Sequence, residues 1–209
     1  NLVKTGTTTI GLVCKDGIVL AADMRVTMGN IVGNKRFDKV YKITDNLALT
    51  TAGTVSDVQL LMKVIKAQLN LNRIRTKKEA SVKEAANLIA MLVYENIRKF
   101  STIPGITGFI LGGKDHTGFY LYEIAPDGSV ILSEDFVTDG SGMVMAIGVL
   151  DTLYKPGLSI DDGVKLAVKA INASIQRDTY SGEGINVFTI TKQGVRKVLT
   201  KELDTNITI

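Results

Sequence analysis

The 209-residue sequence contains one cysteine, one histidine and no tryptophan. A single cysteine cannot form a disulfide within the chain, and Cys14 stands in an apolar run that favours a small buried residue over a catalytic thiol. His116 stands in a polar segment typical of an exposed turn. Zinc fingers, histidine-based zinc sites and Cys–His dyads therefore lack their ligands, and a Ser-His-Asp triad would have to use His116.

The sequence also lacks long apolar runs and a strong excess of charge. No run of about 18 or more apolar residues occurs, so we expect no membrane span, and residues 1–6 are too short and too polar for a secretory signal. The 25 basic and 21 acidic residues leave a formal net charge of +4. The densest basic stretch, residues 73–78, has no aromatic residues between its cations, which favours a solvated helix end over a nucleic-acid patch. We expect a cytoplasmic protein that binds neither membrane nor nucleic acid.

The spacing of apolar residues predicts the secondary structure. Apolar residues at helical spacing predict two helices between residues 54 and 100, a third that ends near 153 and a fourth that begins after Ser159. Thr54 with Asp57 resembles a capping box, and Ser81 with Glu84 forms a complete one. Continuous or alternating β-branched and apolar residues predict strands at 7–14, 18–22, 40–44, 47–51, 108–111, 118–124, 130–132, 185–191 and 195–199.

The order of these elements decides the fold class. Strands are followed by two helices, then strands, two helices and strands, which differs from the alternating pattern of a parallel sheet. We therefore predict an α+β fold in which helix pairs cover two mostly antiparallel sheets. No linker, repeat or low-complexity segment divides the chain, so we expect one domain.

A hydrolase without a usable histidine or cysteine needs another base. A threonine at a chain terminus can use its own α-amino group, whose pKa is about 7.7–8.0. Such a threonine arises by cleavage in front of it. Gly6 before Thr7 suits that cleavage, because glycine allows a bend that brings the Thr7 hydroxyl to the Gly6 carbonyl. Taken alone, these two residues are explained at least as well by a loop glycine before the start of a strand.

Several short motifs follow one another along the chain. They are Thr7-Thr8-Thr9-Ile10-Gly11, Leu20-Ala21-Ala22-Asp23-Met24-Arg25-Val26-Thr27, Lys39, Ala52-Gly53, Gly140-Ser141-Gly142, Arg177-Asp178 and Ser181-Gly182. In this order they resemble a proteasome β-subunit of the archaeal type. No single motif is specific, but the ordered set is, and the resemblance extends from Thr7 to about Val198.

The resemblance implies a threonine endopeptidase that cleaves itself and then hydrolyses unfolded polypeptide. Thr7 would become the nucleophile after autocatalytic cleavage between Gly6 and Thr7. Lys39, held in place by Asp23, would lower the proton affinity of the Thr7 hydroxyl and amine. Three polar side chains would bind and orient that amine and a water molecule: Ser141, Asp178 and Ser181.

The resemblance also implies how substrate binds. The Gly53 backbone N–H would stabilise the oxyanion, Arg25 would be a supporting residue, and the Thr27 backbone would pair with an extended peptide. No metal and no organic cofactor is needed for this chemistry. An uncharged side pocket predicts a preference for apolar residues before the cut; its residues would be Val26, Tyr41, Thr51, Val55 and Gln59.

These positions also have ordinary alternatives. An aspartate and a lysine usually form a surface salt bridge, and Asp178 could accept a hydrogen bond from Arg177 or from a helix end. The segment 140–142 could cap a helix or, more weakly, hold a phosphate, although no complete nucleotide-binding motif accompanies it.

The resemblance implies a four-layer αββα sandwich of the N-terminal nucleophile hydrolase type, formed by residues 7–209 behind a pro-segment remnant of residues 1–6. It implies a seven-membered ring of β-subunits stacked on a second such ring, capped by rings of α-subunits and supplied by an ATP-dependent unfoldase.

Three alternatives to a mature proteasome peptidase stay open. With residues 1–6 attached, the Thr7 nitrogen is an amide, so the chain is zymogen-like unless those residues reflect an incompletely cleaved preparation. It could instead be an unprocessed structural β-subunit that needs a partner β-subunit for maturation. The third alternative is the related bacterial peptidase of six-membered rings, which residues 185–209 fit less well.

Overall fold

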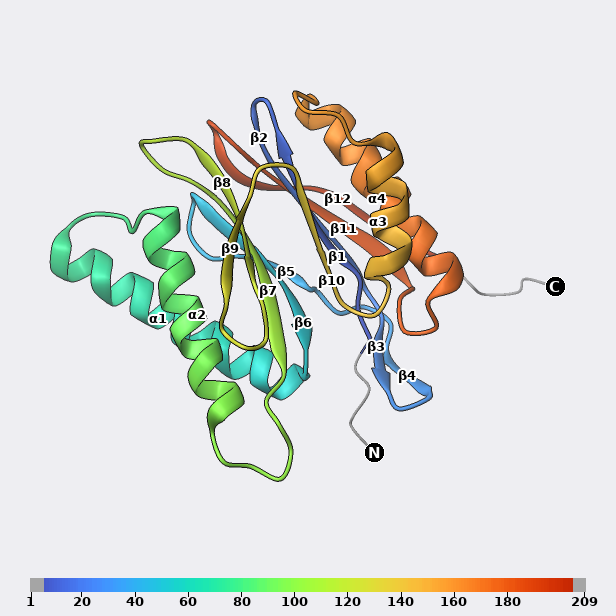
Figure 1. Ribbon diagram of the computed structural model, residues 1–209, viewed down its shortest axis with the longest axis horizontal. Helices are drawn as coiled ribbons and strands as arrows, with labels where there is room; N and C mark the ends of the chain where they lie inside the picture. Colours follow the sequence, from blue (N-terminus) through green and yellow to red (C-terminus); the bar gives the residue numbers. More distant parts are fainter. Residues whose placement is uncertain (1–5, 205–209) are drawn as a thin grey trace.

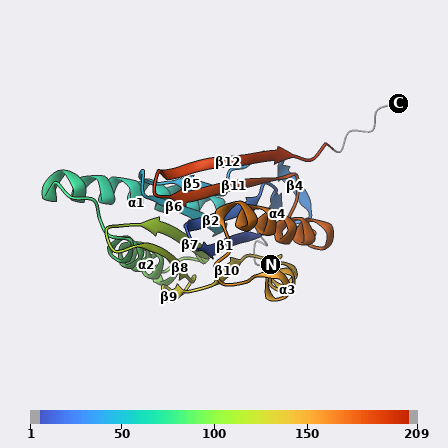
Figure 2. The same cartoon turned by 90° about the horizontal axis from the view of Figure 1, so that it is seen from above.

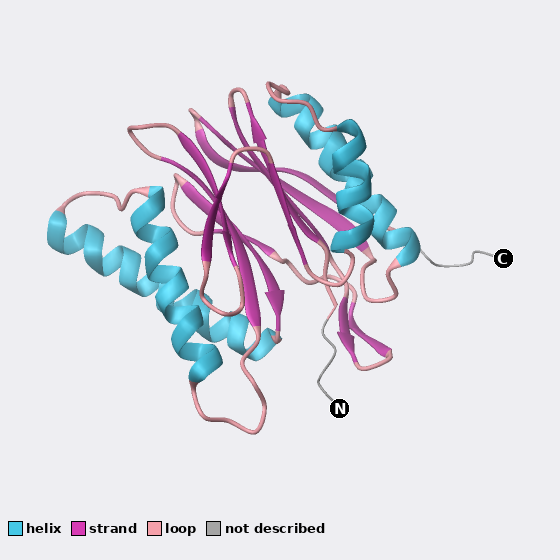
Figure 3. Cartoon of the chain, in the orientation of Figure 1, coloured by secondary structure: helices cyan, strands magenta, loops and turns pink. Residues whose placement is uncertain are grey.

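Two five-stranded antiparallel sheets lie face to face in the computed structural model, which describes residues 6–204. One pair of helices covers the outer face of each sheet (Figure 1). Coloured by element type, the layers run helix, sheet, sheet, helix (Figure 3), and the two helix pairs lie at opposite ends of the view from above (Figure 2). The predicted α+β fold with an αββα sandwich is confirmed.

The elements follow the predicted order. The first sheet has the order β10 (Phe136–Asp139), β1 (Thr9–Cys14), β2 (Gly17–Asp23), β11 (Gly184–Thr191) and β12 (Gly194–Glu202). The second has the order β5 (Val40–Lys42), β6 (Leu47–Gly53), β7 (Thr107–Lys114), β8 (Phe119–Ile124) and β9 (Val130–Ser133). The helices are α1 (Val55–Thr76), α2 (Val82–Arg98), α3 (Met143–Leu153) and α4 (Ile160–Arg177).

The position of strand β2 in the sheet explains why its sequence is continuously apolar. Its neighbours β1 and β11 pair with it on both sides, so it lies inside the sheet. Successive side chains of a strand point to opposite faces. Ile18 and Leu20 pack between the two sheets, whereas Val19 and Ala21 pack under α3 and α4. Both faces of this strand are therefore buried, and polar residues have no place until Asp23 at its end.

The helix starts agree with the capping residues in two of three cases. Ser81 and Glu84 form the complete capping box that begins α2, and the Ser159 side chain accepts from the Asp162 N–H at the start of α4. Thr54 precedes α1 but makes no side-chain cap, so the capping box expected there was wrong. The Thr54 N–H already donates to the Ile106 carbonyl at 3.1 Å, which leaves no donor for Asp57 to satisfy.

Three strands were absent from the sequence prediction. Strands β3 (Val26–Met28) and β4 (Ile31–Asn34) form a separate hairpin, and β10 pairs with β1 at the edge of the first sheet. The hairpin projects from the body of the molecule near β1 (Figure 1), and Met28 and Ile31 are 66% and 69% exposed. A strand of three or four residues has too few alternating positions to be recognised.

Candidate active site

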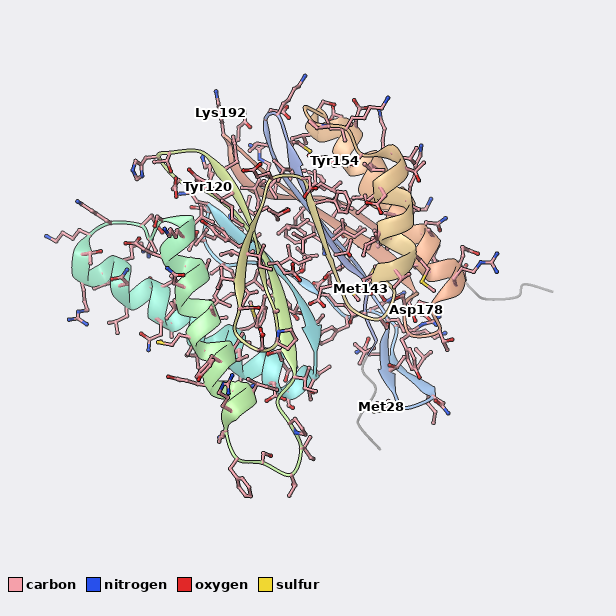
Figure 4. All side chains as sticks on the ribbon, in the orientation of Figure 1. Met28, Tyr120, Met143, Tyr154, Asp178 and Lys192 are labelled. Carbon is pink, nitrogen blue, oxygen red and sulfur yellow. The ribbon has the colours of Figure 1, made fainter. Side chains whose placement is uncertain are left out.

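Most of the residues that the sequence analysis nominated for the site gather where the two sheets meet at one end of the sandwich. Thr7 comes just before β1 and Asp23 ends β2, and the antiparallel pairing of these strands places them side by side. Lys39 reaches the same place from the second sheet, where its carbonyl accepts from the Thr51 N–H at 2.9 Å. Asp178 follows the last residue of α4, beside Met143 at the start of α3 (Figure 4).

Lys39 and Asp23 form a buried ion pair. The Lys39 Nζ lies 2.8 Å from Asp23 Oδ1, and the two side chains are 3% and 0% exposed. Asp23 also accepts three backbone N–H bonds, from Thr8 at 2.9 Å, Arg25 at 3.0 Å and Gly182 at 3.0 Å. Burial lowers the pKa of Lys39 from its ordinary value, and the Asp23 carboxylate opposes that shift. The pair is thus a buried element of the site and not a surface salt bridge.

Thr7 is positioned against the peptide bond that precedes it. Its hydroxyl donates to the Gly6 carbonyl oxygen at 2.6 Å, and the Lys39 ammonium donates to the same oxygen at 3.4 Å. A Cβ at residue 6 would collide with the Cβ of Tyr180, so only glycine fits the observed path of the chain. The carbonyl in front of Thr7 is therefore held close to both a hydroxyl and a cation.

Hydrogen bonds connect the Thr7 nitrogen to the far side of the site. The Thr7 N–H donates to Ser141 Oγ at 3.2 Å, and Ser141 Oγ donates to Asp178 Oδ2 at 2.6 Å. Ser181 Oγ donates to the same carboxylate oxygen at 2.6 Å and lies 2.7 Å from the Thr8 hydroxyl. Ser141 is exposed, so solvent reaches the network beside the Thr7 nitrogen. The predicted residues on this side contact one another, and Thr8 joins them.

Comparison with known proteins identifies the family. A family model described as "Proteasome subunit" matches residues 3–190. This chain belongs to the proteasome subunit family. It is 44% identical to "Proteasome subunit beta" of Ferroglobus placidus over 97% of this chain and 94% of that protein. It is 41% identical to the Methanothermobacter thermautotrophicus protein of that name, over 94% and 91% of the two chains. A further relative, "Proteasome subunit beta 2" of Pyrococcus furiosus, is 42% identical over 95% and 94%.

The matched region of this proteasome subunit contains every site residue described above, and the family fold is the α+β sandwich of N-terminal nucleophile hydrolases. The match includes all of the second sheet and, in the first sheet, ends at Ile190 in β11, before β12.

A small cavity lies beside Thr7 in this proteasome subunit. Of the predicted pocket residues, Val26, Thr51 and Val55 line it, together with Thr27, Lys39 and Gly53. Tyr41 and Gln59 are not among its lining residues. Tyr41 packs against the core beneath α1 and α2, where burial raises its pKa to about 12, and Gln59 is exposed on α1.

Two residues that line the cavity were missed by sequence reasoning. Val58 belongs to the apolar stripe of α1 and is indistinguishable from a core residue by spacing alone. Phe37 follows two basic residues, Lys35 and Arg36, in a segment without periodicity. With both included, the cavity walls away from Lys39 are apolar or carry only threonine hydroxyls.

Gly53 lines the cavity and has a backbone conformation that other residues rarely adopt. Its φ is +128°, and a Cβ there would collide with the Ile106 carbonyl oxygen. Arg25, the predicted supporting residue, donates from Nη2 to Glu183 Oε1 at 2.9 Å and from Nη1 to the Thr179 carbonyl at 2.8 Å. It therefore contacts the loop that carries Ser181 and not Thr7 itself.

Other chemical features are sparse between residues 6 and 204. No group of three or more His, Cys, Asp or Glu residues in this range could hold a metal ion. No helix in the described part of the chain is long and apolar enough to cross a membrane. Cys14 is buried at the end of β1, where burial raises the pKa of its thiol to about 12, and His116 is exposed.

Proposed function

We propose that this chain is a threonine-type endopeptidase subunit of a proteasome core particle, with Thr7 as its nucleophile after cleavage of the Gly6–Thr7 bond. One observation carries the proposal: the Thr7 hydroxyl donates to the Gly6 carbonyl oxygen at 2.6 Å, with the buried Lys39 ammonium on the same oxygen. Intramolecular acyl transfer requires a hydroxyl held close to the carbonyl and a group that stabilises the developing oxyanion.

The first reaction is cleavage in front of Thr7. Thr7 Oγ1 attacks the Gly6 carbonyl carbon, its proton passes to the Thr7 nitrogen, and the C–N bond breaks as an ester forms on Oγ1. Water then hydrolyses the ester, which leaves a carboxyl group on Gly6 and restores the Thr7 hydroxyl. The product has a free α-amine on Thr7 with a pKa of about 7.7–8.0, close to the pH at which a general base works best.

Peptide hydrolysis uses the same groups. The Thr7 amine takes the hydroxyl proton as Oγ1 attacks the substrate carbonyl, and it returns that proton to the departing amine of the substrate. Water then hydrolyses the ester on Oγ1. We assign Ser141, Asp178 and Ser181 to hold the amine and the water, because Ser141 already accepts from the Thr7 nitrogen. Gly53 is assigned as the oxyanion donor.

The Lys39 ammonium would stabilise negative charge on Thr7 Oγ1 as the hydroxyl loses its proton. Asp23 keeps the ammonium in place, and its remaining lone pairs are occupied by backbone N–H groups. The cavity beside Thr7 would bind the substrate side chain before the cut, with the Thr27 backbone pairing with the extended peptide. Its apolar lining supports a preference for apolar residues at that position.

The proposed assembly is a seven-membered β ring stacked on a second β ring and capped by α-subunit rings. An ATP-dependent unfoldase would supply unfolded polypeptide in the cytoplasm. The names of the relatives support this assembly over a six-membered bacterial peptidase. Exposed apolar side chains on the outer helices are suited to burial between subunits; they include Leu60, Leu71, Ile74, Met91, Met143, Val144 and Leu153.

A second candidate function is a structural β-subunit that keeps residues 1–6. While residue 6 is attached, the Thr7 nitrogen is an amide and cannot act as the base, so the peptidase role requires cleavage whereas the structural role does not. In that case a partner β-subunit would supply the peptidase activity.

Intact mass of the chain after assembly with its α-subunits distinguishes the two functions. Loss of the mass of residues 1–6 supports the active peptidase, and their retention in a complete particle supports the structural subunit. The control is Thr7→Ala, which we expect to fold and assemble but to lose both self-cleavage and hydrolysis of a fluorogenic peptide. Peptide hydrolysis by Thr7→Ala particles at the parent rate would exclude Thr7 as the nucleophile.

A further inference from the structure

Glu183 combines burial with an unfavourable backbone conformation. It is 8% exposed, and its φ of +66° is one of only two positive values among non-glycine residues between residues 6 and 204. Left-handed backbone is disfavoured for residues that have a Cβ, and it is retained where surrounding contacts require it. The other such residue, Lys77, is the C-cap of α1, where this conformation is common.

The Glu183 carboxylate holds the Arg25 guanidinium. Its Oε1 accepts from Arg25 Nε at 3.2 Å and from Nη2 at 2.9 Å, and the two side chains are 7% and 24% exposed. The third guanidinium nitrogen of Arg25 donates to the Thr179 carbonyl at 2.8 Å. Arg25 therefore connects both ends of the segment 179–183, and Glu183 fixes Arg25 in the orientation that does so.

The same segment is attached to the end of β2 by its backbone. The Gly182 N–H donates to Asp23 Oδ2 at 3.0 Å, and the Gly182 carbonyl accepts from the Met24 N–H at 3.1 Å. A Cβ at Gly182 would press against the Arg25 guanidinium, so the ion pair and the backbone lie in direct contact. Ser181 precedes Gly182 and donates to Asp178 at 2.6 Å. Arg25 thus contacts the segment whose Ser181 shares the Asp178 carboxylate with Ser141, the residue that accepts from the Thr7 nitrogen.

We propose that Glu183 is a positioning residue for the Thr7 peptidase and that it acts through Arg25. This inference rests on the proposed function. The carboxylate orients Arg25, which fixes the segment 179–183 and with it the hydroxyl of Ser181 and the carboxylate of Asp178. Glycine would suit the backbone at residue 183 better than glutamate, but it has no carboxylate to hold Arg25.

The experiment compares Glu183→Gly with Lys77→Gly in particles assembled with the α-subunits. Both substitutions relieve the same backbone strain, but only the first removes a contact to the site. We expect Glu183→Gly to lower kcat for a fluorogenic peptide by about tenfold, because small misplacements of catalytic groups are costly. KM should stay within about twofold, since no substrate contact is lost. Glu183→Gln keeps an oxygen acceptor and should restore most of kcat, and Lys77→Gly should leave both constants unchanged.

A double-mutant cycle with Arg25→Gln tests the route. If Glu183 acts through Arg25, the double variant is no slower than Arg25→Gln alone. Additive losses, or an unchanged kcat in Glu183→Gly, overturn the proposal. If Glu183→Gly does not assemble, the same cycle is run with Glu183→Asn, because asparagine tolerates the left-handed backbone but is too short to hold Arg25; additive losses there overturn the proposal. If Thr7→Ala particles hydrolyse the peptide at the parent rate, both the proposed function and this inference are overturned. If hydrolysis depends on Thr7 but not on residue 183, only this inference is overturned.

Discussion

Replacing Lys39 by methionine removes a buried cation but keeps a side chain of similar length. The change leaves the Asp23 carboxylate 0% exposed without its ionic partner. Removing one partner of a buried pair costs about 3–5 kcal/mol of unfolding free energy, because the remaining charge is buried unpaired. Asp23 keeps three backbone N–H bonds, so we expect a loss near the lower end, about 3 kcal/mol.

A loss of this size is measurable by thermal unfolding of the full chain. For a protein of about 200 residues, 1 kcal/mol corresponds to roughly 2–4 °C, so Lys39→Met should lower Tm by about 6–12 °C. The matched control is Lys197→Met, which makes the same chemical change at an exposed pair with Asp38, 37% and 56% exposed. An exposed pair contributes at most about 1 kcal/mol, so the control should shift Tm by a few degrees at most.

The same variant tests the chemistry separately from stability. Lys39→Met should fail to cleave itself at a temperature where it is still folded, because no cation then lies near the Gly6 carbonyl oxygen. The reasoning about burial is refuted if Lys39→Met and Lys197→Met lower Tm equally. The proposed role of Lys39 is refuted if the folded variant loses residues 1–6 at the parent rate.

Three further changes test other parts of the structure. Gly6→Ala should slow self-cleavage, because its Cβ would displace Tyr180 and the carbonyl facing Thr7; an unchanged cleavage rate by mass spectrometry would contradict this. Hydrogen bonds from Ser81 lower the pKa of Glu84 below its ordinary 4.5, so the stability that the carboxylate contributes is present above pH 4.5 and is lost as pH falls through the lowered pKa. Glu84→Gln should therefore lower Tm at pH 7, and the difference from the parent should shrink as the pH is lowered below 4.5; a difference independent of pH would contradict this. Burial raises the pKa of Cys14 to about 12, so iodoacetamide should label the native chain at pH 8 far more slowly than the chain in denaturant, and equal rates would show an accessible thiolate.

The helices and strands that the sequence predicted are those whose buried faces produce a regular pattern of apolar residues. Strand β2 reads as continuously apolar because both of its faces are covered, and the stripe of α1 reads as helical because one face packs on a sheet. The hairpin of β3 and β4 has neither property, since Met28 and Ile31 face solvent. The spacing of apolar residues reflects which positions are buried, so it does not identify short exposed strands.

The candidate site was nominated from the order of short motifs, and local patterns alone would not have nominated it. Thr7 and Lys39 look ordinary in their own segments, and only the shape of the fold brings them together. The pocket was predicted less well. Val58 has the spacing of a core residue and lines the cavity, whereas Tyr41 packs into the core. Glu183 gave no signal, because neither its backbone angle nor its contact with Arg25 is visible in the sequence.

The separation of the site residues along the chain determines when, during synthesis, the site can form. The hydrogen bond from Thr7 to Ser141 joins residues 134 positions apart, and that between Thr8 and Ser181 spans 173 positions. A chain emerging from the ribosome contains Thr7 and Lys39 long before Asp178 and Ser181 have been synthesised. The proposed set of site residues is therefore incomplete until synthesis has almost finished and both sheets have paired. A free Thr7 amine would then form only after the rest of the fold that surrounds it has been made.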